Sequence, residues 1–165
     1  ESGLFGNTGQ ANYAAAKSGI AGFTKVVARD LGRYGVTANS ICPRANTRMI
    51  DSVPDLARQR RATRPDDMDH APQASEMSPD DIAPMVAYLA SDRASNINGQ
   101  TFLVYGGTIT RLSQPRKVKT IFKRGRWGLD ELRKLVPQAI TTGLVNPSPP
   151  QPAKSSPNTE ADNLD

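Results

Sequence analysis

Apolar or aromatic side chains recur at every third or fourth position of residues 13–31, and no other pattern constrains the fold of this chain as strongly. The spacing predicts an amphipathic helix of about five turns. Gly32 and Gly35 bracket its expected end. The short β-rich run of residues 36–41 comes next and predicts a buried strand, which we expect Pro43 to stop. This part of the chain therefore predicts a long helix that leads into a sheet.

The same order of elements returns later in the chain. The run SPDD at residues 78–81 has the composition of a helix start, with a hydroxyl cap, a proline in the first turn and two acids near the positive helix end. An apolar stripe follows over residues 82–89, and Pro84 predicts an irregular first turn or a bend. Residues 100–105 predict another strand, which Gly106 and Gly107 end.

Between these two parts, residues 44–77 have no steady period, and we expect a surface loop or lid with a short helix near residues 55–63. Helix, strand, loop, helix and strand in this order predict the second half of an α/β fold with a parallel sheet. Because two strands do not make a stable sheet of this type, we expect the sequence to be a fragment. Its helix stripes would then pack on sheet partners from elsewhere in the protein.

The 165-residue chain has a net charge of +5, and its basic character belongs to one segment. Seven basic and no acidic residues lie between Thr108 and Trp127. We therefore expect three parts: an α/β region over residues 1–110, a basic extension over residues 111–145, and a disordered polar tail over residues 146–165. Within the extension, residues 129–136 predict a short amphipathic helix, which Pro137 ends.

The composition restricts partners and location. Phe122 and Trp127 in the basic segment are suited to stack on nucleic-acid bases, but a solvated arm packed on a partner subunit is the interpretation that we favour. No apolar run approaches the ~18 residues of a membrane span. We therefore expect neither nucleic acid nor membrane as a partner. The lone cysteine, Cys42, excludes an internal disulfide and indicates a reducing compartment, and we expect a cytoplasmic protein.

Tyr13 and Lys17 lie four residues apart, and therefore one turn apart on the same side of the predicted helix. A buried lysine ammonium near a phenol favours the phenolate and lowers the tyrosine pKa. Such a pair donates and accepts protons near neutral pH, as carbonyl reduction and alcohol oxidation require. The same spacing is frequent in ordinary amphipathic helices, so the residues around the pair decide its meaning.

Two stretches around these features resemble the C-terminal half of a short-chain dehydrogenase/reductase. They read NYAAAKSGIAGFTKVVARDLGRYGVTANSICP (residues 12–43) and SPDDIAPMVAYLASDRASNINGQTFLVYGG (residues 78–107), and the resemblance covers roughly residues 1–110. It implies a partial Rossmann fold, the C-terminal half of a doubly wound parallel sheet. It also implies an oxidoreductase that uses NAD or NADP to transfer hydride between nicotinamide and a hydroxy or oxo substrate.

The resemblance implies a role for each matching residue. Tyr13 corresponds to the catalytic tyrosine, and Lys17 to the residue that lowers its pKa and hydrogen-bonds the nicotinamide ribose. Pro43 and the residues after it correspond to the loop under the nicotinamide ring, and Thr47 corresponds to a hydroxyl on the carboxamide or phosphates. As an alternative, Thr47 caps a following helix. The implied cofactor-binding set is Tyr13, Lys17, Pro43, Arg44, Ala45 and Thr47.

The chain departs from the family pattern in several respects. The family's catalytic serine would fall just ahead of Glu1, and Ser2 is out of register for that role. The dinucleotide loop and the residues that choose between NAD and NADP would also lie upstream. The usual glycine after Pro43 is Arg44 here, and the path to Thr47 is one residue shorter than the common form.

The shortened stretch and the basic segment are similar to the (3R)-hydroxyacyl-CoA dehydrogenase and 3-oxoacyl reductase-like branch. The resemblance implies a 3-hydroxyacyl or 3-oxoacyl thioester substrate, such as an acyl-CoA, whose phosphates the basic segment would contact. It also implies that the parent protein is a homodimer or homotetramer, whereas the truncated chain itself is expected to be inactive. A non-catalytic interaction module is the alternative function, and a basic nucleic-acid-binding protein is a third. No metal site is expected, since His70 has no neighbouring His or Cys.

Overall fold

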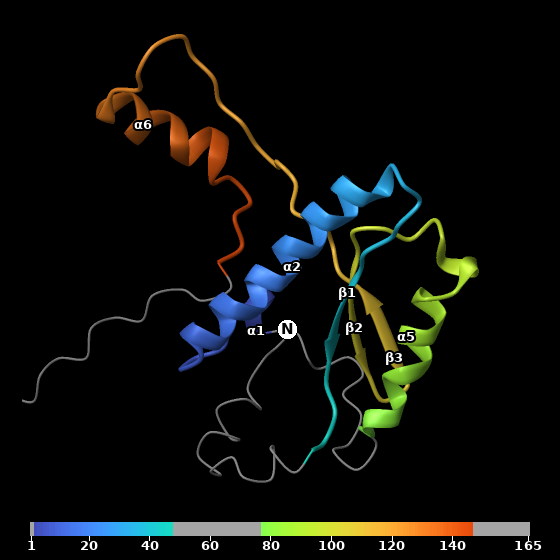
Figure 1. The fold of residues 1–165 in the computed structure, drawn as a ribbon. Coiled ribbons are helices and arrows are strands. Elements are labelled where there is room, and N and C mark those ends of the chain that lie inside the picture. Colours follow the sequence, from blue (N-terminus) through green and yellow to red (C-terminus); the bar gives the residue numbers. More distant parts are fainter. Residues whose placement is uncertain (1, 48–76, 147–165) are drawn as a thin grey trace, which may run out of the picture. The chain divides into compact units, whose positions relative to one another are not determined.

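A computed structural model of the chain describes residues 2–47 and 77–146. The chain divides between Gln114 and Pro115 into two compact units. The expected helix at residues 55–63, the rest of the expected lid from residue 48 to 76, and the tail from residue 147 lie outside the described residues. Figure 1 shows the course of the chain.

The first unit contains a three-stranded sheet in the order β1-β2-β3. Strand β1 (Ser40–Pro43) pairs in parallel with β2 (Thr101–Tyr105), with Ile41 opposite Phe102. The predicted parallel sheet is therefore confirmed. Strand β3 (Thr108–Arg111) runs antiparallel to β2 and was not predicted. The two glycines between β2 and β3 form a tight hairpin turn, in which Gly106 has φ of 47°.

Helix α2 (Ala11–Gly32) confirms the helix predicted from the apolar period, and Gly35, at φ 76°, follows its end as predicted. A four-residue helix, α1 (Ser2–Phe5), precedes it. Strand β1 starts at Ser40, later than predicted. The reason is that side chains hold the residues before it: the Ala38 N–H donates to Asn98 Oδ1, and the Asn39 amide donates to the Ile97 carbonyl.

Pro43 was expected to stop β1 but is its last residue, opposite Val104. Proline is tolerated there because the pairing continues through the next residue, whose N–H (Arg44) donates to the Val104 carbonyl over 3.0 Å. The ladder therefore extends past the proline, and Arg44 is fixed to β2 by its backbone.

The second helix of this unit begins as the SPDD run predicted. Ser78 forms a capping box with Asp81, in which the Ser78 N–H donates to the Asp81 carboxylate over 2.9 Å. The first turn is a 3-10 helix, η3 (Pro79–Asp81), and the α-helix α5 (Ala83–Leu89) follows only after it. This confirms the irregular start predicted from Pro84, which removes a backbone donor. A second 3-10 turn, η4 (Asp92–Ala94), leads toward β2.

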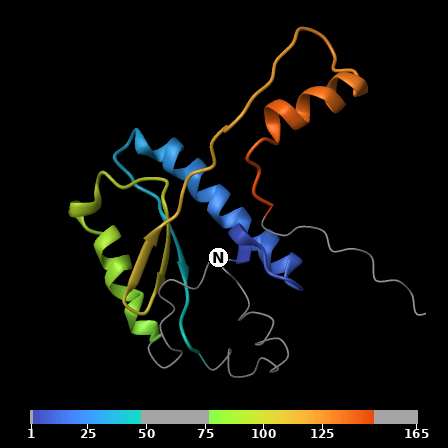
Figure 2. The same cartoon turned by 180° about the vertical axis from the view of Figure 1, so that it is seen from behind.

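The core lies between the sheet and α5. Phe102 and Val104 of β2 pack with Met85 of α5, and Val104 is fully buried. Because side chains alternate along a strand, the buried Thr101 and Leu103 point to the opposite face of the sheet. Figures 1 and 2 show α2 and α5 on opposite sides of the sheet. The arrangement is a helix layer on each face, as in doubly wound α/β folds.

In the second unit, described from Pro115 to Asn146, helix α6 (Leu129–Leu135) confirms the predicted amphipathic helix. Its expected end at Pro137 is wrong, because the helix continues as a π-helix, η5 (Val136–Ile140). Pro137 is the second residue of η5 and therefore lies in its first turn, where a missing N–H is tolerated. The Thr141 N–H donates to the Val136 carbonyl, five residues back, as is typical of a π-helix. None of the helices within residues 2–47 and 77–146 is long and apolar enough to cross a membrane.

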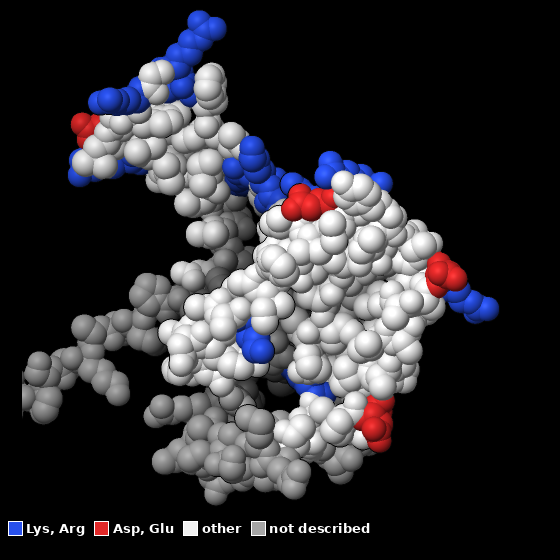
Figure 3. Space-filling view, viewed as in Figure 1, with Lys and Arg blue, Asp and Glu red and all other residues white. Residues whose placement is uncertain are grey.

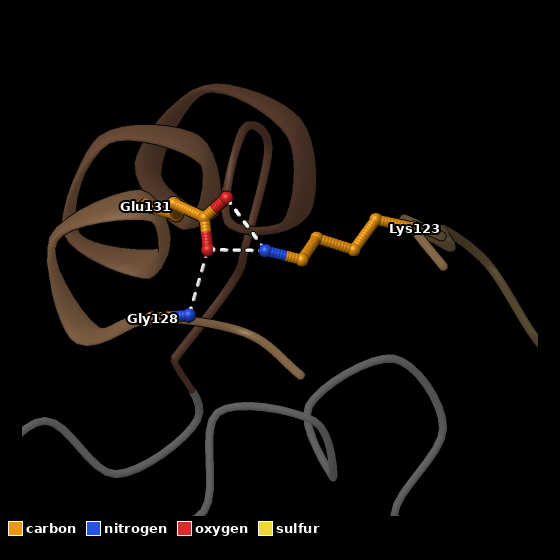
Figure 4. Close-up of polar contacts among 3 residues, drawn as sticks. All are labelled: Lys123, Gly128 and Glu131. Carbon is orange, nitrogen blue, oxygen red and sulfur yellow. Dashed lines mark hydrogen bonds and ion pairs between the residues drawn. The ribbon is translucent and has the colours of Figure 1, made fainter. Parts of the chain in front are cut away.

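The start of α6 is held by Lys123 and Glu131 (Figure 4). The Glu131 carboxylate accepts a hydrogen bond from the Gly128 N–H over 2.7 Å, which caps the helix, and forms an ion pair with the Lys123 ammonium over 2.5 Å. The same ammonium lies 5.3 Å from the centroid of the Trp127 ring. These contacts lower the pKa of Glu131, with the hydrogen bond from Lys123 as the largest cause and that from Gly128 next.

We expect the start of α6 to loosen in acid. Because the folded pKa of Glu131 lies below its unfolded value, the contacts stabilise the unit at pH values above the ordinary glutamate pKa of about 4.3, and this stabilisation is lost as the pH falls through the lowered value. The amide resonance of Gly128, followed by NMR over a pH titration, should shift in that range. Glu131→Gln should remove the transition, whereas Asp130→Asn should retain it. A shift that persists in Glu131→Gln would assign the titration to another group.

Candidate active site

Tyr13 and Lys17 lie in the first turns of α2, one turn apart, as their spacing predicted. The Lys17 Nζ atom is 5.4 Å from the centroid of the Tyr13 ring. The Tyr13 N–H donates to the Asn12 side-chain oxygen over 2.8 Å, so that the helix start fixes the backbone of the tyrosine. The helix therefore presents a phenol and an ammonium group side by side.

Both side chains are more exposed than expected. A buried lysine was expected beside the phenol, but Lys17 is exposed and Tyr13 retains 50% of its accessible surface. The residues of α2 that are buried, Ala21 and Ala28, lie farther along the same side of the helix. This side of α2 is therefore covered in its later turns, whereas its amino end, which carries the pair, is open to a ligand as far as the described residues are concerned.

Helix α1 packs tightly against α2 beside this pair. The Ser18 hydroxyl donates to the Gly3 carbonyl over 2.5 Å and also contacts the Ala14 carbonyl over 2.7 Å. A Cβ atom added to Gly3 would come within 2.7 Å of the Ser18 nitrogen and 2.9 Å of the Lys17 Cβ. Sequence reasoning missed this role of Gly3. A glycine at this position was the only signal in the sequence, and the close approach of α1 to α2 explains why a glycine is needed there.

We expect Gly3→Ala to separate α1 from α2. The added methyl group meets backbone atoms that cannot move aside, and overpacking of this kind costs about 1–3 kcal/mol. Hydrogen exchange should show lost protection at the Gly6 amide, which donates to the Ser2 carbonyl at the end of α1. The matched control is Gly19→Ala in α2, where an added Cβ meets nothing within 4 Å. Equal protection in the two variants would contradict the prediction.

The second group of expected site residues follows β1. Pro43 ends the strand, and Arg44 continues its pairing through the bond to the Val104 carbonyl. The Arg44 guanidinium carbon lies 4.9 Å from the centroid of the Tyr105 ring at the end of β2. Ala45 is half-buried and Thr47 is exposed. The helix that Thr47 would cap in the alternative interpretation lies outside the described residues.

Both groups lie at the same end of the first unit. Figures 1 and 2 show the amino end of α2 and the carboxyl end of β1 toward the lower edge of this unit. This is the edge at which open α/β sheets bind their ligands, beyond the carboxyl ends of the parallel strands. The arrangement therefore presents a phenol, two cations and a hydroxyl along this edge. In the part of the chain that the structure describes, no cluster of His, Cys, Asp or Glu is suited to hold a metal ion.

The basic segment belongs mainly to the second unit, whose described residues include eight basic and two acidic side chains. Both acids form ion pairs, Glu131 with Lys123 and Asp130 with Arg133. The remaining cations are therefore not neutralised by carboxylates of the same described unit. Figure 3 shows that the basic side chains (blue) project from this unit in several directions rather than toward one point.

The chain is similar to known proteins over most of the described residues. A family model described as enoyl-(acyl carrier protein) reductase matches residues 2–108. The hydroxyacyl-CoA dehydrogenase ChsB1 of Mycobacterium tuberculosis is 45% identical over 137 residues, which cover 80% of this chain and 39% of that protein. The 3-oxoacyl-[acyl-carrier-protein] reductase FabG of Vibrio cholerae is 44% identical over 106 residues, which cover 64% of this chain and 41% of that protein.

A solved structure, that of a short chain dehydrogenase from Mycobacterium avium, resembles the chain with a TM-score of 0.61 and 34% identity. The likeness covers 82% of this chain and 39% of that one. The chain thus spans about two fifths of the length of the curated relatives that it matches.

Proposed function

The chain belongs to the short-chain dehydrogenase/reductase family, and we propose that it provides the proton-transfer pair of an NAD- or NADP-dependent oxidoreductase. The predicted family, its 3-oxoacyl reductase-like branch and the partial Rossmann fold are confirmed by these similarities. The observation that carries the proposal is the pair on α2: Lys17 Nζ lies 5.4 Å from the Tyr13 ring at the amino end of the helix, which is open to a ligand.

Tyr13 is the proposed acid and base. Its phenol oxygen gives a proton to the substrate oxygen in carbonyl reduction and takes it back in alcohol oxidation. The phenol carries negative charge after it has given up its proton, and the nearby Lys17 ammonium stabilises that charge. The fixed helical spacing keeps the two groups together through the reaction.

The donor set also fits a nicotinamide coenzyme. The Tyr13 hydroxyl and Lys17 ammonium are exposed at the amino end of α2 and are suited to the hydroxyl groups of a ribose. Pro43, Arg44, Ala45 and Thr47 leave β1 at the carboxyl edge where dinucleotides bind in open α/β sheets. When bound, the coenzyme supplies hydride in reduction and accepts it in oxidation. The chain's own part is to orient the reactants and to move the proton at the Tyr13 oxygen.

The proposed substrate is a 3-hydroxyacyl or 3-oxoacyl thioester. The named activities of two similar proteins, a hydroxyacyl-CoA dehydrogenase and a 3-oxoacyl-[acyl-carrier-protein] reductase, support this class. The match to the hydroxyacyl-CoA dehydrogenase covers 80% of the 165 residues. Wherever such a match begins, it includes residues 34–132 and therefore the basic segment. This favours an acyl-CoA substrate.

The proposed reaction is tested on the complete gene product with a short 3-oxoacyl-CoA and either NADH or NADPH. We expect the absorbance of one reduced coenzyme to fall only when the thioester is present. The same assay with the two coenzymes in parallel decides between NAD and NADP. If a folded protein oxidises neither coenzyme with any 3-oxoacyl thioester, the proposed substrate class is wrong.

We further propose that the protein forms a homodimer or homotetramer in the cytoplasm. Ile20, Phe23 and Val26 of α2 are 52%, 67% and 55% exposed, respectively, and such large apolar side chains favour burial by another surface. The cytoplasmic location rests on the lone cysteine. Light scattering of the complete gene product tests the assembly, and Phe23→Asp should lower the measured mass if α2 forms the interface.

A further inference from the structure

Ser18 follows Lys17 in α2, and its hydroxyl lies between two carbonyl oxygens. The hydroxyl donates to the Gly3 carbonyl of α1 over 2.5 Å, and the Ala14 carbonyl, one turn earlier in α2, is 2.7 Å from it. Ala14 comes directly after Tyr13 in the chain. Ser18 therefore ties α1 to the turn of α2 that carries the proposed proton-transfer pair.

Apolar burial contributes little to holding α1 on α2. None of the residues of α1 is buried, and its two large side chains, Leu4 and Phe5, are 40% and 57% exposed. The link to α2 turns through Gly6 and Gly9, at φ of 76° and 78°, and these residues have no side chains that pack on the helix. In the described part of the chain, the bond from Ser18 is therefore important for holding α1 in place.

The backbone of α1 lies against the root of the Lys17 side chain. A Cβ atom added to Gly3 would come within 2.9 Å of the Lys17 Cβ atom. A long side chain in a helix leans toward the amino end, which for Lys17 is the direction of Tyr13. With α1 in place, the rotamers that direct the lysine toward α1 are blocked. The remaining rotamers keep its ammonium near the phenol, where Nζ lies 5.4 Å from the centroid of the Tyr13 ring.

We infer that Ser18 is a positioning residue for the proposed proton transfer, because its hydroxyl holds α1 where α1 keeps the Lys17 ammonium beside the Tyr13 phenol. The inference rests on the proposed function, which gives Lys17 its task. Ser18 acts through Lys17, and its hydroxyl exchanges no proton with the substrate. A charged group that has to be correctly oriented loses effect when its productive arrangement is less populated.

Turnover of a 3-oxoacyl-CoA by the complete gene product tests the kinetic effect. We expect Ser18→Ala to lower kcat about 3- to 10-fold, the range for loss of one hydrogen bond that holds the productive arrangement, with little change in KM for the thioester. The decisive comparison repeats the substitution in a Lys17→Met protein. Because Ser18 is inferred to act through Lys17, Ser18→Ala should cause no further loss of kcat in that background.

Nuclear magnetic resonance tests the positioning without any turnover. In the complete gene product with labelled lysine and tyrosine, we expect a nuclear Overhauser effect between the Lys17 side chain and the Tyr13 ring. Ser18→Ala should weaken it. Gly3→Ala, which displaces α1 by a different route, should weaken it as well. A wild-type protein that reduces no 3-oxoacyl-CoA contradicts the proposed function, while this measurement still decides whether Ser18 positions Lys17.

Thr24 offers a matched control in the same helix. Its hydroxyl donates to the Ile20 carbonyl over 2.9 Å, the same bond to the preceding turn that Ser18 makes, but within α2 alone. Thr24→Val should leave kcat and the Overhauser effect unchanged. An unchanged Overhauser effect in Ser18→Ala overturns the inference. A loss of kcat that is equally large with and without Lys17, or that Thr24→Val reproduces, overturns it too, since Ser18 would then stabilise the helix in general.

Discussion

Tyr13→Phe is expected to lower kcat about 10²- to 10⁴-fold in the complete gene product, the usual contribution of a positioned acid or base. The substitution removes one oxygen atom and keeps the ring that lies 5.4 Å from the Lys17 ammonium. The helix and its amino end should therefore stay intact. The reduced coenzyme should still bind, because Lys17 and the residues that follow β1 remain in place.

Two measurements make this result specific. Titration of NAD(P)H into Tyr13→Phe should still show binding, weakened at most about tenfold by the loss of one hydrogen bond to the ribose, which separates lost chemistry from lost binding. Tyr34→Phe is the control, since Tyr34 is a more exposed tyrosine just beyond the other end of the same helix. It should turn over like the wild type. Retained turnover in Tyr13→Phe would remove the residue from the proposed proton transfer.

Phe102→Ala is expected to lower the free energy of unfolding of the first unit by about 3–5 kcal/mol. The Phe102 side chain is 6% exposed and packs in the core with Val104 and Met85. Truncation leaves a cavity between β2 and α5, because the backbone of β2 is held by hydrogen bonds to strands on both sides. Denaturant unfolding of the complete gene product, followed by circular dichroism, measures the loss.

Phe122→Ala serves as the comparison. Phe122 is 84% exposed, so its truncation should change the stability by no more than about 0.5 kcal/mol. A small effect at Phe102 would mean that the core collapses around the missing ring, or that β2 contributes little to stability. The contrast between the two phenylalanines therefore tests whether the buried face of β2 organises the unit.

The elements that sequence alone predicted are those with a local cause. The apolar period of α2, the capping box at Ser78 and the irregular start near Pro84 all depend on residues within a few positions of one another. Each could be predicted from the sequence because the interaction that stabilises it lies within the segment itself.

The parts that the sequence did not predict depend on residues distant in the chain. Strand β3 was missed because Gly106 and Gly107 have the composition of a strand end, and only the partner β2 makes them a hairpin. The late start of β1 follows from side chains of the Asn39 and Asn98 regions, which replace backbone pairing there. The stacking of Arg44 on Tyr105 joins the ends of two strands that only the parallel pairing brings together.

The candidate site was predicted to a similar extent. The pairing of Tyr13 with Lys17 follows from helix geometry, and the structure has the two groups in contact range. Their exposure was not predictable, because burial depends on what covers a helix face and not on its own spacing. The roles assigned to Pro43, Arg44, Ala45 and Thr47 stay predictions.

The hairpin between β2 and β3 determines where the chain leaves the first unit. An antiparallel return carries the backbone from Tyr105 back along the sheet until Arg111 lies opposite Phe102. Gln114 then donates to the Gly99 carbonyl, beside the beginning of β2. The exit point of the first unit is therefore at the edge where the parallel strands start, and the residues proposed to react lie at the edge where these strands end. Residues inserted at this exit, directly after Gln114, should therefore leave the proposed proton transfer at Tyr13 unchanged.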